Sequence, residues 1–318
     1  MKKKYLLIVL FAINLISSQN FHDTKGELAV TSAGIASYKI PIALPPGIKD
    51  VAPQLALVYN GTSVQGMAGI GWNLVGVSSI TRISSRLDLD NTIDAVDFDD
   101  LDRFALDGQR LIDKIGTYGV AGTTYQTENY SNLKIESVGS FVYPGLTGAS
   151  GPQSFTVTFP DGSQAFYGGT VDSRGLMEWM INRWIDPQGN YIDYTYEVES
   201  STIRIKKISW GKNTNSTSTY ENLIEFTYKS RIRAEYSYLK NIKIAATKIL
   251  SFVSVKTGGI PFKTYTLEHE TISGNYQRVR KVIESNGAGE TANPVVFDYN
   301  ITAEGFGEFS YYKSPTNS

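Results

Sequence analysis

The sequence predicts an all-β protein made of antiparallel, hairpin-rich sheets, arranged as a shell or sandwich. The 318 residues include 20 Tyr, 14 Phe and 29 Gly. Aromatic side chains suit a pleated, half-buried surface, and glycine suits frequent turns. Apolar residues alternate with polar ones at a period of two over many short segments, which is typical of strands. No segment of ordinary helix length keeps an apolar stripe at helical spacing.

The chain begins with the pattern of an export signal. Lys2, Lys3 and Lys4 precede the apolar run Tyr5–Ile16, and Ser17–Gln19 offers a cleavage point. A run of this length is too short for a bilayer span, which needs about 20 residues. We therefore expect a Sec-type signal peptide over 1–19, export from the cytoplasm to the cell surface or medium, and no membrane span. Residues 20–29 then form a polar lead-in.

The first predicted strands are Ala36–Leu44 and Leu55–Tyr59, because every second residue in each is apolar. Pro41 lies within the first of them and has no N–H to donate. We expect this strand at a sheet edge or a bulge. Pro45–Gly47 breaks the chain between the two strands.

The same alternation predicts strands through the rest of the chain, with turns between them. Asp107-Gly108, Asp161-Gly162 and Asp186–Asn190 have hairpin-turn composition, and the polar tract Lys212–Thr219 reads as a loop. Tyr-x-Tyr-like strands recur after such turns at irregular spacing, which indicates stacked hairpin units. The predicted strands are Phe155–Phe159, Met177–Trp184, Tyr191–Val198, Ile203–Trp210, Leu223–Tyr228, Ile242–Val255, Thr264–His269 and Val295–Tyr299.

Composition excludes several kinds of chemistry. The formal net charge is -1, and we expect no basic stripe and no nucleic-acid partner. Cysteine is absent, so disulfides, a thiolate nucleophile and a Cys-ligated zinc site are excluded. The two histidines are His22 and His269. A Ser-His-Asp triad would depend on His269, which lies on a predicted strand and is interpreted as structural.

An acidic stretch is the best candidate for metal binding. Calcium prefers several carboxylate oxygens, but the spacing does not match an EF-hand loop. We predict a solvated acidic loop, with a calcium site as the alternative. Its members are Asp88, Asp90, Asp94, Asp97, Asp99, Asp100 and Asp102.

Two enzyme classes are not expected. A glycosidase needs two facing carboxylates, and the best pair is Glu178 with Asp186 or Asp193. Glu178 alternates with Trp179 and is expected to face solvent, as is Glu225. We also expect no Glu-x-Glu pair, the spacing usual in ADP-ribosyltransferases that modify arginine.

Two further motifs have a structural and a functional interpretation. The glycine-rich run Gly66–Gly71 superficially resembles a phosphate-binding loop, but no helical pattern follows it. We predict a tight turn there, with Trp72 in the core. Exposed aromatic residues such as Tyr191, Tyr194 or Trp210 could bind sugar rings, although aromatic residues on strands usually pack against each other.

Several stretches follow one another in a characteristic order: Ala33–Ala36, Tyr38–Ile42, Leu44–Gly47, Pro53–Asn60, Gly69–Leu74, Asp99–Phe104, Leu106–Leu111, Arg183–Trp184 and Asn190–Tyr196. Together they resemble the N-terminal domain of the SpvB family and of Tc-toxin B subunits. The resemblance covers residues 30–300, and it implies a β-rich scaffold related to the Rhs/YD-like shell that encloses a toxic fragment. Relatives continue into further repeats or a toxic domain, so residues 301–318 are expected to be a tail or the truncated start of a next module.

The sequence therefore predicts a secreted, non-catalytic structural or interaction domain without cofactor, metal or catalytic residues. Its expected partners are other toxin-complex or Rhs-repeat protein segments. A carbohydrate-binding or adhesive surface protein, with cell-surface glycans as partners, is the alternative.

Overall fold

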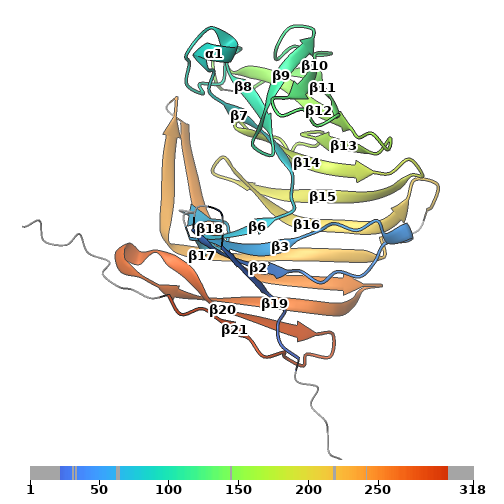
Figure 1. The fold of residues 1–318 in the computed structure, drawn as a ribbon, viewed down its shortest axis with the longest axis vertical. Coiled ribbons are helices and arrows are strands. Elements are labelled where there is room, and N and C mark those ends of the chain that lie inside the picture. Colours follow the sequence, from blue (N-terminus) through green and yellow to red (C-terminus); the bar gives the residue numbers. More distant parts are fainter. Residues whose placement is uncertain are drawn as a thin grey trace, which may run out of the picture.

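A computed structural model describes residues 22–299, except 31, 33, 62–64, 144, 218–219 and 241. Within these residues, the strands pair antiparallel in two sheets, a six-stranded small sheet and a fifteen-stranded large sheet. One end of the large sheet is rolled up, and its other end is open and lies behind the small sheet (Figure 1). The predicted all-β, antiparallel class is confirmed.

The spatial order of the strands defines both sheets. The small sheet runs β1 (Glu27–Val30), β2 (Ala36–Pro41), β3 (Ala56–Asn60), β6 (Trp72–Val75), β5 (Gly69–Ile70) and β4 (Gln65–Gly66). The large sheet runs β13 (Gln164–Tyr167), β12 (Ser150–Thr158), β11 (Lys134–Val142), β10 (Thr124–Thr127), β9 (Gln109–Ile115), β8 (Arg103–Leu106), β7 (Ser79–Ile83), β14 (Glu178–Ile185), β15 (Asn190–Glu199), β16 (Thr202–Asn213), β17 (Asn222–Leu239), β18 (Ile242–Thr257), β19 (Ile260–Thr271), β20 (Gln277–Asn286) and β21 (Val295–Val296). The short helical turns are η1 (Ile48–Asp50), α1 (Leu87–Asp90) and η2 (Ser273–Asn275).

Strands β7 to β14 close into a ring, because β13 pairs with β12 on one side and with β14 on the other. Alternation sends every second side chain into the ring, where large aromatics fill it. Trp179 meets the rings of Phe104 and Phe155 nearly edge-on, at centroid distances of 5.3 and 5.2 Å. Edge-to-face contacts of this kind favour one arrangement of the core.

The small sheet packs on the large one through a core shared with the ring. Trp210 on β16 is fully buried, and its indole N–H donates to the carbonyl of Pro45 at 3.1 Å. The Ala43 N–H donates to the hydroxyl of Tyr265 on β19 at 2.9 Å. Trp210 is 165 residues from Pro45 in the sequence. The conformation of the segment Pro45–Gly47 is thus held by side chains distant in the chain.

The hairpin β17–β18 extends beyond its neighbours as an arm that rises towards α1 (Figure 1). Leu239 and Ile242 at its end pack against a second small core built on Phe98 and Tyr143. Lys240 lies 3.2 Å from a carboxylate oxygen of Asp97. The arm therefore links the open end of the large sheet to the loop beside the ring.

The predicted strands are all present, although the last one is reduced to Val295–Val296. Asp107 and Gly108 have φ of 47° and 81°, the positive values of a two-residue hairpin turn, as predicted. Pro41 ends β2, an interior strand of the small sheet, but β1 pairs only as far as Lys39, so no ladder bond is lost at Pro41.

Of the segments predicted at the two ends of the chain, only the lead-in lies partly within the described residues. The predicted lead-in 20–29 contains the start of β1, and the buried Thr24 hydrogen-bonds to Asn293. The predicted signal peptide 1–19 and the tail 301–318 lie outside the described residues. Among the residues described, no helix has the length and apolarity to cross a membrane.

Candidate functional site

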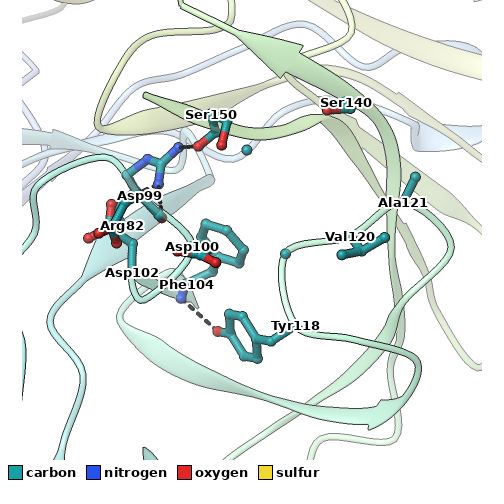
Figure 2. A pocket seen from close by; sticks show the side chains of 12 residues that line it. Arg82, Asp99, Asp100, Asp102, Phe104, Tyr118, Val120, Ala121, Ser140 and Ser150 are labelled. Atoms are coloured by element: carbon teal, nitrogen blue, oxygen red, sulfur yellow. Dashed lines mark hydrogen bonds and ion pairs between the residues drawn. The ribbon is translucent and has the colours of Figure 1, made fainter. Parts of the chain in front are cut away.

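A cavity of about 240 Å³ opens at the end of the ring where β7 meets β8 and β9 meets β10. Its wall combines the acidic loop with strand ends brought together by ring closure (Figure 2). The side chains most relevant to chemistry are Arg82, Asp102, Phe104 and Tyr118.

Arg82 is fully buried at this cavity, and protein acceptors surround its guanidinium group. Its Nε donates to the carbonyl of Leu176 at 3.0 Å, its Nη1 to Asp102 at 2.7 Å and its Nη2 to the carbonyl of Ser150 at 2.6 Å. The guanidinium carbon also lies 5.3 Å from the ring centroid of Trp179. Arg82 thus joins β7, the acidic loop and β12, and each of its three nitrogens is already engaged.

Asp102 is the fully buried partner of Arg82. Its oxygens accept backbone hydrogen bonds from Asp97 at 3.1 Å and from Phe98 at 2.9 Å. Burial raises the pKa of this carboxyl, and Arg82 with the two N–H donors acts in the opposite direction. The prediction of a solvated acidic loop is therefore wrong for Asp102, which anchors the loop to the ring.

Tyr118 closes the other side of the cavity. Its ring stacks on Phe104 at a centroid distance of 5.4 Å. Its hydroxyl accepts the N–H of Phe104 at 2.8 Å and donates to the carbonyl of Leu111 at 3.1 Å. Burial raises the pKa of Tyr118, which keeps the phenol neutral. Its bonds connect the 118–121 loop to β8 and β9.

Asp90 is a second member of the acidic stretch that is not solvated. Its carboxylate lies 2.8 Å from Arg103 and also pairs with Arg110. Burial acts against its charged form, but hydrogen bonds from the Arg86 backbone and from Arg103 outweigh burial and lower the pKa of Asp90. This residue ends the single turn of α1 and ties it to β8 and β9.

The structure brings three other carboxylates of the stretch together. Ligand oxygens of Asp94, Asp97 and Asp99 lie within 4.8 Å of one another. Lys240 on the arm already supplies a positive charge to Asp97. The calcium alternative remains a prediction.

The carboxylates considered for glycosidase chemistry are kept apart. Glu178 is half-buried on β14, contrary to the expectation that it faces solvent, and burial raises its pKa to about 7. Asp193 pairs with Arg183, and Arg183 is five residues from Glu178 along β14, which is about 17 Å at the rise of a strand. Asp186 is further still and accepts two hydrogen bonds from Asn190, both at 2.7 Å. Glycosidase pairs lie within about 10 Å, so no such pair is assembled here.

Glu225 and the glutamates at Glu-x-Glu spacing all form ion pairs. Glu225 pairs with Lys256 at 2.7 Å on the surface, as expected. The expectation of no Glu-x-Glu pair is wrong, because Glu197 and Glu199 have this spacing, as do Glu268 and Glu270. Glu197 and Glu199 both bind Arg204, at 3.0 and 2.7 Å, and Glu268 and Glu270 pair with Lys281 and Arg278 on the neighbouring strand.

The glycine-rich run and His269 form one structural contact. Gly66–Gly71 makes the short turns of β4 and β5, as predicted, and Trp72 is fully buried after them. His269 Nε2 lies 3.0 Å from the carbonyl of Ala68 within this run. Burial, together with Lys229, lowers the pKa of His269 to about 4, so the imidazole is neutral at pH 7.

The aromatic residues proposed as sugar contacts are in the core. Trp210, Tyr191 and Tyr194 are 0%, 6% and 6% exposed, so the expectation that they are surface residues is wrong. Exposed tyrosines occur instead at Tyr130, Tyr220 and, on the arm, Tyr236 and Tyr238. Arg82 was not predicted, because its only local signal is a cation inside an alternating apolar segment.

Several solved structures are similar to this fold. The solved neighbours include the N-terminal domain of effector protein SpvB from Salmonella typhimurium strain LT2, with 16% identity, a TM-score of 0.61, and coverage of 78% of this chain and 98% of that one. The TcdB2-TccC3 crystal structure matches with 16% identity and a TM-score of 0.64 over 86% of this chain. The Photorhabdus luminescens Tc holotoxin pore carrying TccC3-D651A matches with 16% identity and a TM-score of 0.65 over 92%.

This chain spans only 16% and 17% of the two toxin chains. No curated protein matches it. The family model described as Salmonella virulence plasmid 65kDa B protein matches residues 30–300, which is most of the sequence. The extent predicted from the sequence motifs is the same. The chain belongs to the SpvB family.

Proposed function

We propose that this chain is an exported, non-catalytic scaffold domain that binds other protein segments of a toxin complex. The proposal rests on the hydrogen bonds that the charged groups at the ring cavity already make. Arg82 and Asp102 are satisfied by each other, by backbone carbonyls and by backbone N–H groups. Groups engaged in this way stabilise the ring and hold no reactive proton for a substrate.

The similarity to solved structures supports the scaffold part of the proposal. The chain resembles nearly the whole of the SpvB N-terminal domain and a limited part of the Tc chains. A domain of this kind acts through its surface and through continuation of its sheets. We therefore expect its partners to be β-rich segments of toxin-complex or Rhs-repeat proteins.

The test is a pull-down from the native secretome with tagged residues 20–318, followed by mass spectrometry. Recovery of a toxin-complex or Rhs-repeat protein supports the proposal. A folded, monomeric chain that recovers neither would overturn it. Trp72→Ala, which empties a fully buried site, is the matched control and should lose the partner together with the fold.

The non-catalytic and exported parts have separate tests. Hydrolysis of chromogenic glycosides by the purified chain that disappears in Glu178→Gln would refute the first. For the second, expression of the full sequence in a bacterial host should give an exported product whose N-terminus lies near residue 20. A product retained in the cytoplasm with Met1 intact would contradict export.

A further inference from the structure

The arm concentrates positive charge that the composition of the whole chain does not reveal. Its described segments 229–240 and 242–248 contain six cationic residues and one carboxylate, Glu235. Arg231 pairs with Glu235 at 3.3 Å, and Lys240 pairs with Asp97. The expectation of no basic stripe is therefore wrong for this hairpin. The cations are Lys229, Arg231, Arg233, Lys240, Lys243 and Lys248.

Four of these cations remain without a carboxylate. Among the residues that the structure describes, no acidic oxygen lies within ion-pair distance of Lys229, Arg233, Lys243 or Lys248. Arg233 instead lies over the ring of Tyr276 at 4.3 Å, and Lys243 over the ring of Tyr236 at 3.9 Å. These contacts leave Arg233 and Lys243 without an ion pair within the described residues, while Arg233 acts on Glu235 at longer range.

The arm also exposes apolar surface. Ile232, Tyr236 and Tyr238 are 60%, 55% and 66% exposed on β17. Tyr236 and Tyr238 are two residues apart on a strand and so share one face. Exposed aromatic side chains beside free cations are typical of a surface that is covered when a partner binds.

The outer edge of the arm has no neighbouring strand. Strand β16 pairs with β17 only over Lys207–Trp210 and Asn222–Glu225. Beyond that point, within the described residues, β17 is paired on its β18 side alone, from Glu235↔Ala246 to Leu239↔Ile242. One outer backbone group is used, since the Ile232 N–H donates to the side chain of Gln277 at 2.8 Å. An unpaired strand edge is a template for strand addition.

We propose that the outer edge of β17 between Arg233 and Leu239 binds an extended acidic segment of a partner protein as an added strand. The free N–H and C=O groups pair with its backbone, and Arg233 and Lys243 pair with its carboxylates. Tyr236 and Tyr238 cover its apolar side chains. A nucleic acid or an anionic membrane would satisfy the charges but has no backbone to pair with the edge. The inference rests on the proposed function for the expectation of a protein partner.

The experiment measures fluorescence anisotropy of labelled ten-residue peptides with the folded chain, residues 20–318. The probe alternates Glu with Val, and a second probe replaces Glu with Lys. A third keeps the sequence of the first but carries a methyl group on every backbone nitrogen, which preserves the charge and removes the N–H donors of both strand edges. We expect binding of the first probe and at least a tenfold loss for each of the others. Equal binding of the N-methylated probe would overturn strand addition.

Variants locate the site on the arm. Arg233→Glu with Lys243→Glu should weaken the Glu-Val probe about tenfold or more at low salt. Lys114→Glu, an exposed residue of β9 on the ring, should leave affinity unchanged. Circular dichroism verifies that each variant is folded. An equal loss of affinity in the arm double variant and in Lys114→Glu would refute the arm as the binding site. Tighter binding of oligo-dT or anionic vesicles than of the peptide would refute a polypeptide partner.

The two proposals fail differently. If the secretome pull-down recovers its partner equally well with the arm double variant, the scaffold function stands and the arm inference falls. If the peptide binds only through an intact arm but no toxin-complex protein is recovered, the arm inference stands and the proposed function falls.

Discussion

The ion pair between Arg82 and Asp102 should stabilise the ring as a unit, and a double-mutant cycle can measure it. Both side chains are fully buried, 2.7 Å apart. Arg82→Met leaves Asp102 buried with only two backbone donors, and Asp102→Asn leaves a buried guanidinium without its counter-charge. Each should lower the free energy of unfolding by about 3–5 kcal/mol, because one charge is left uncompensated. The double variant removes both charges and should cost clearly less than the sum.

Urea denaturation at pH 7 is the assay, followed by tryptophan fluorescence and by circular dichroism. The two probes must coincide for the free energies to be valid. Trp179 lies beside the guanidinium group, so its fluorescence reports on the ring. We expect a coupling energy of about 2 kcal/mol or more. Additivity within about 0.5 kcal/mol would refute the reasoning, because it would mean that the two residues contribute independently.

Two other predictions follow from burial and from backbone geometry. Burial raises the pKa of Glu178 to about 7, whereas the unfolded chain releases this proton near the ordinary pKa of 4.5, so stability falls as the pH rises between these values. Glu178→Gln should therefore stabilise the protein by up to about 3 kcal/mol at pH 8 and change little at pH 4, and an equal effect at both would contradict the buried carboxyl. Gly69→Ala should lower the free energy of unfolding in urea by about 1–3 kcal/mol, because φ is +119° and the added Cβ would lie 2.8 Å from the carbonyl oxygen of Gln277. Gly108→Ala, with φ of +81° but open space around it, is its control and should cost only the backbone strain of about 1–2 kcal/mol; a larger loss there than at Gly69 would contradict the packing argument.

Local alternation predicts strands, but it does not predict which strands pair. The segment Met177–Trp184 was predicted because its apolar residues alternate, and β14 is found there. Strand β14 also pairs with β13 and so closes a ring. This closure depends on the twist of the sheet and on contacts between segments distant in sequence. Strands β7 to β11 were missed because they are short, polar or interrupted by glycine, as in Lys134–Val142.

The candidate site was the hardest part to predict. Arg82 and Asp102 are 20 residues apart, and nothing local distinguishes Asp102 from its solvated neighbours. The expectation that Tyr191, Tyr194 and Trp210 are exposed was wrong for a similar reason, because alternation on β15 and β16 does not tell which face the small sheet covers. That face is set by bonds such as Trp210 to Pro45, which link segments far apart in the chain.

The pairing of β14 with three other strands has a consequence for unfolding. Residues 178–180 pair with β7 of the ring, residues 183–185 pair with β15 of the open sheet, and residues 181 and 183–185 pair with β13. Neither part can lose this strand without exposing the core of the other. The ring and the open sheet should therefore melt in one cooperative transition, and pulling the chain apart from its ends should rupture both together instead of one after the other.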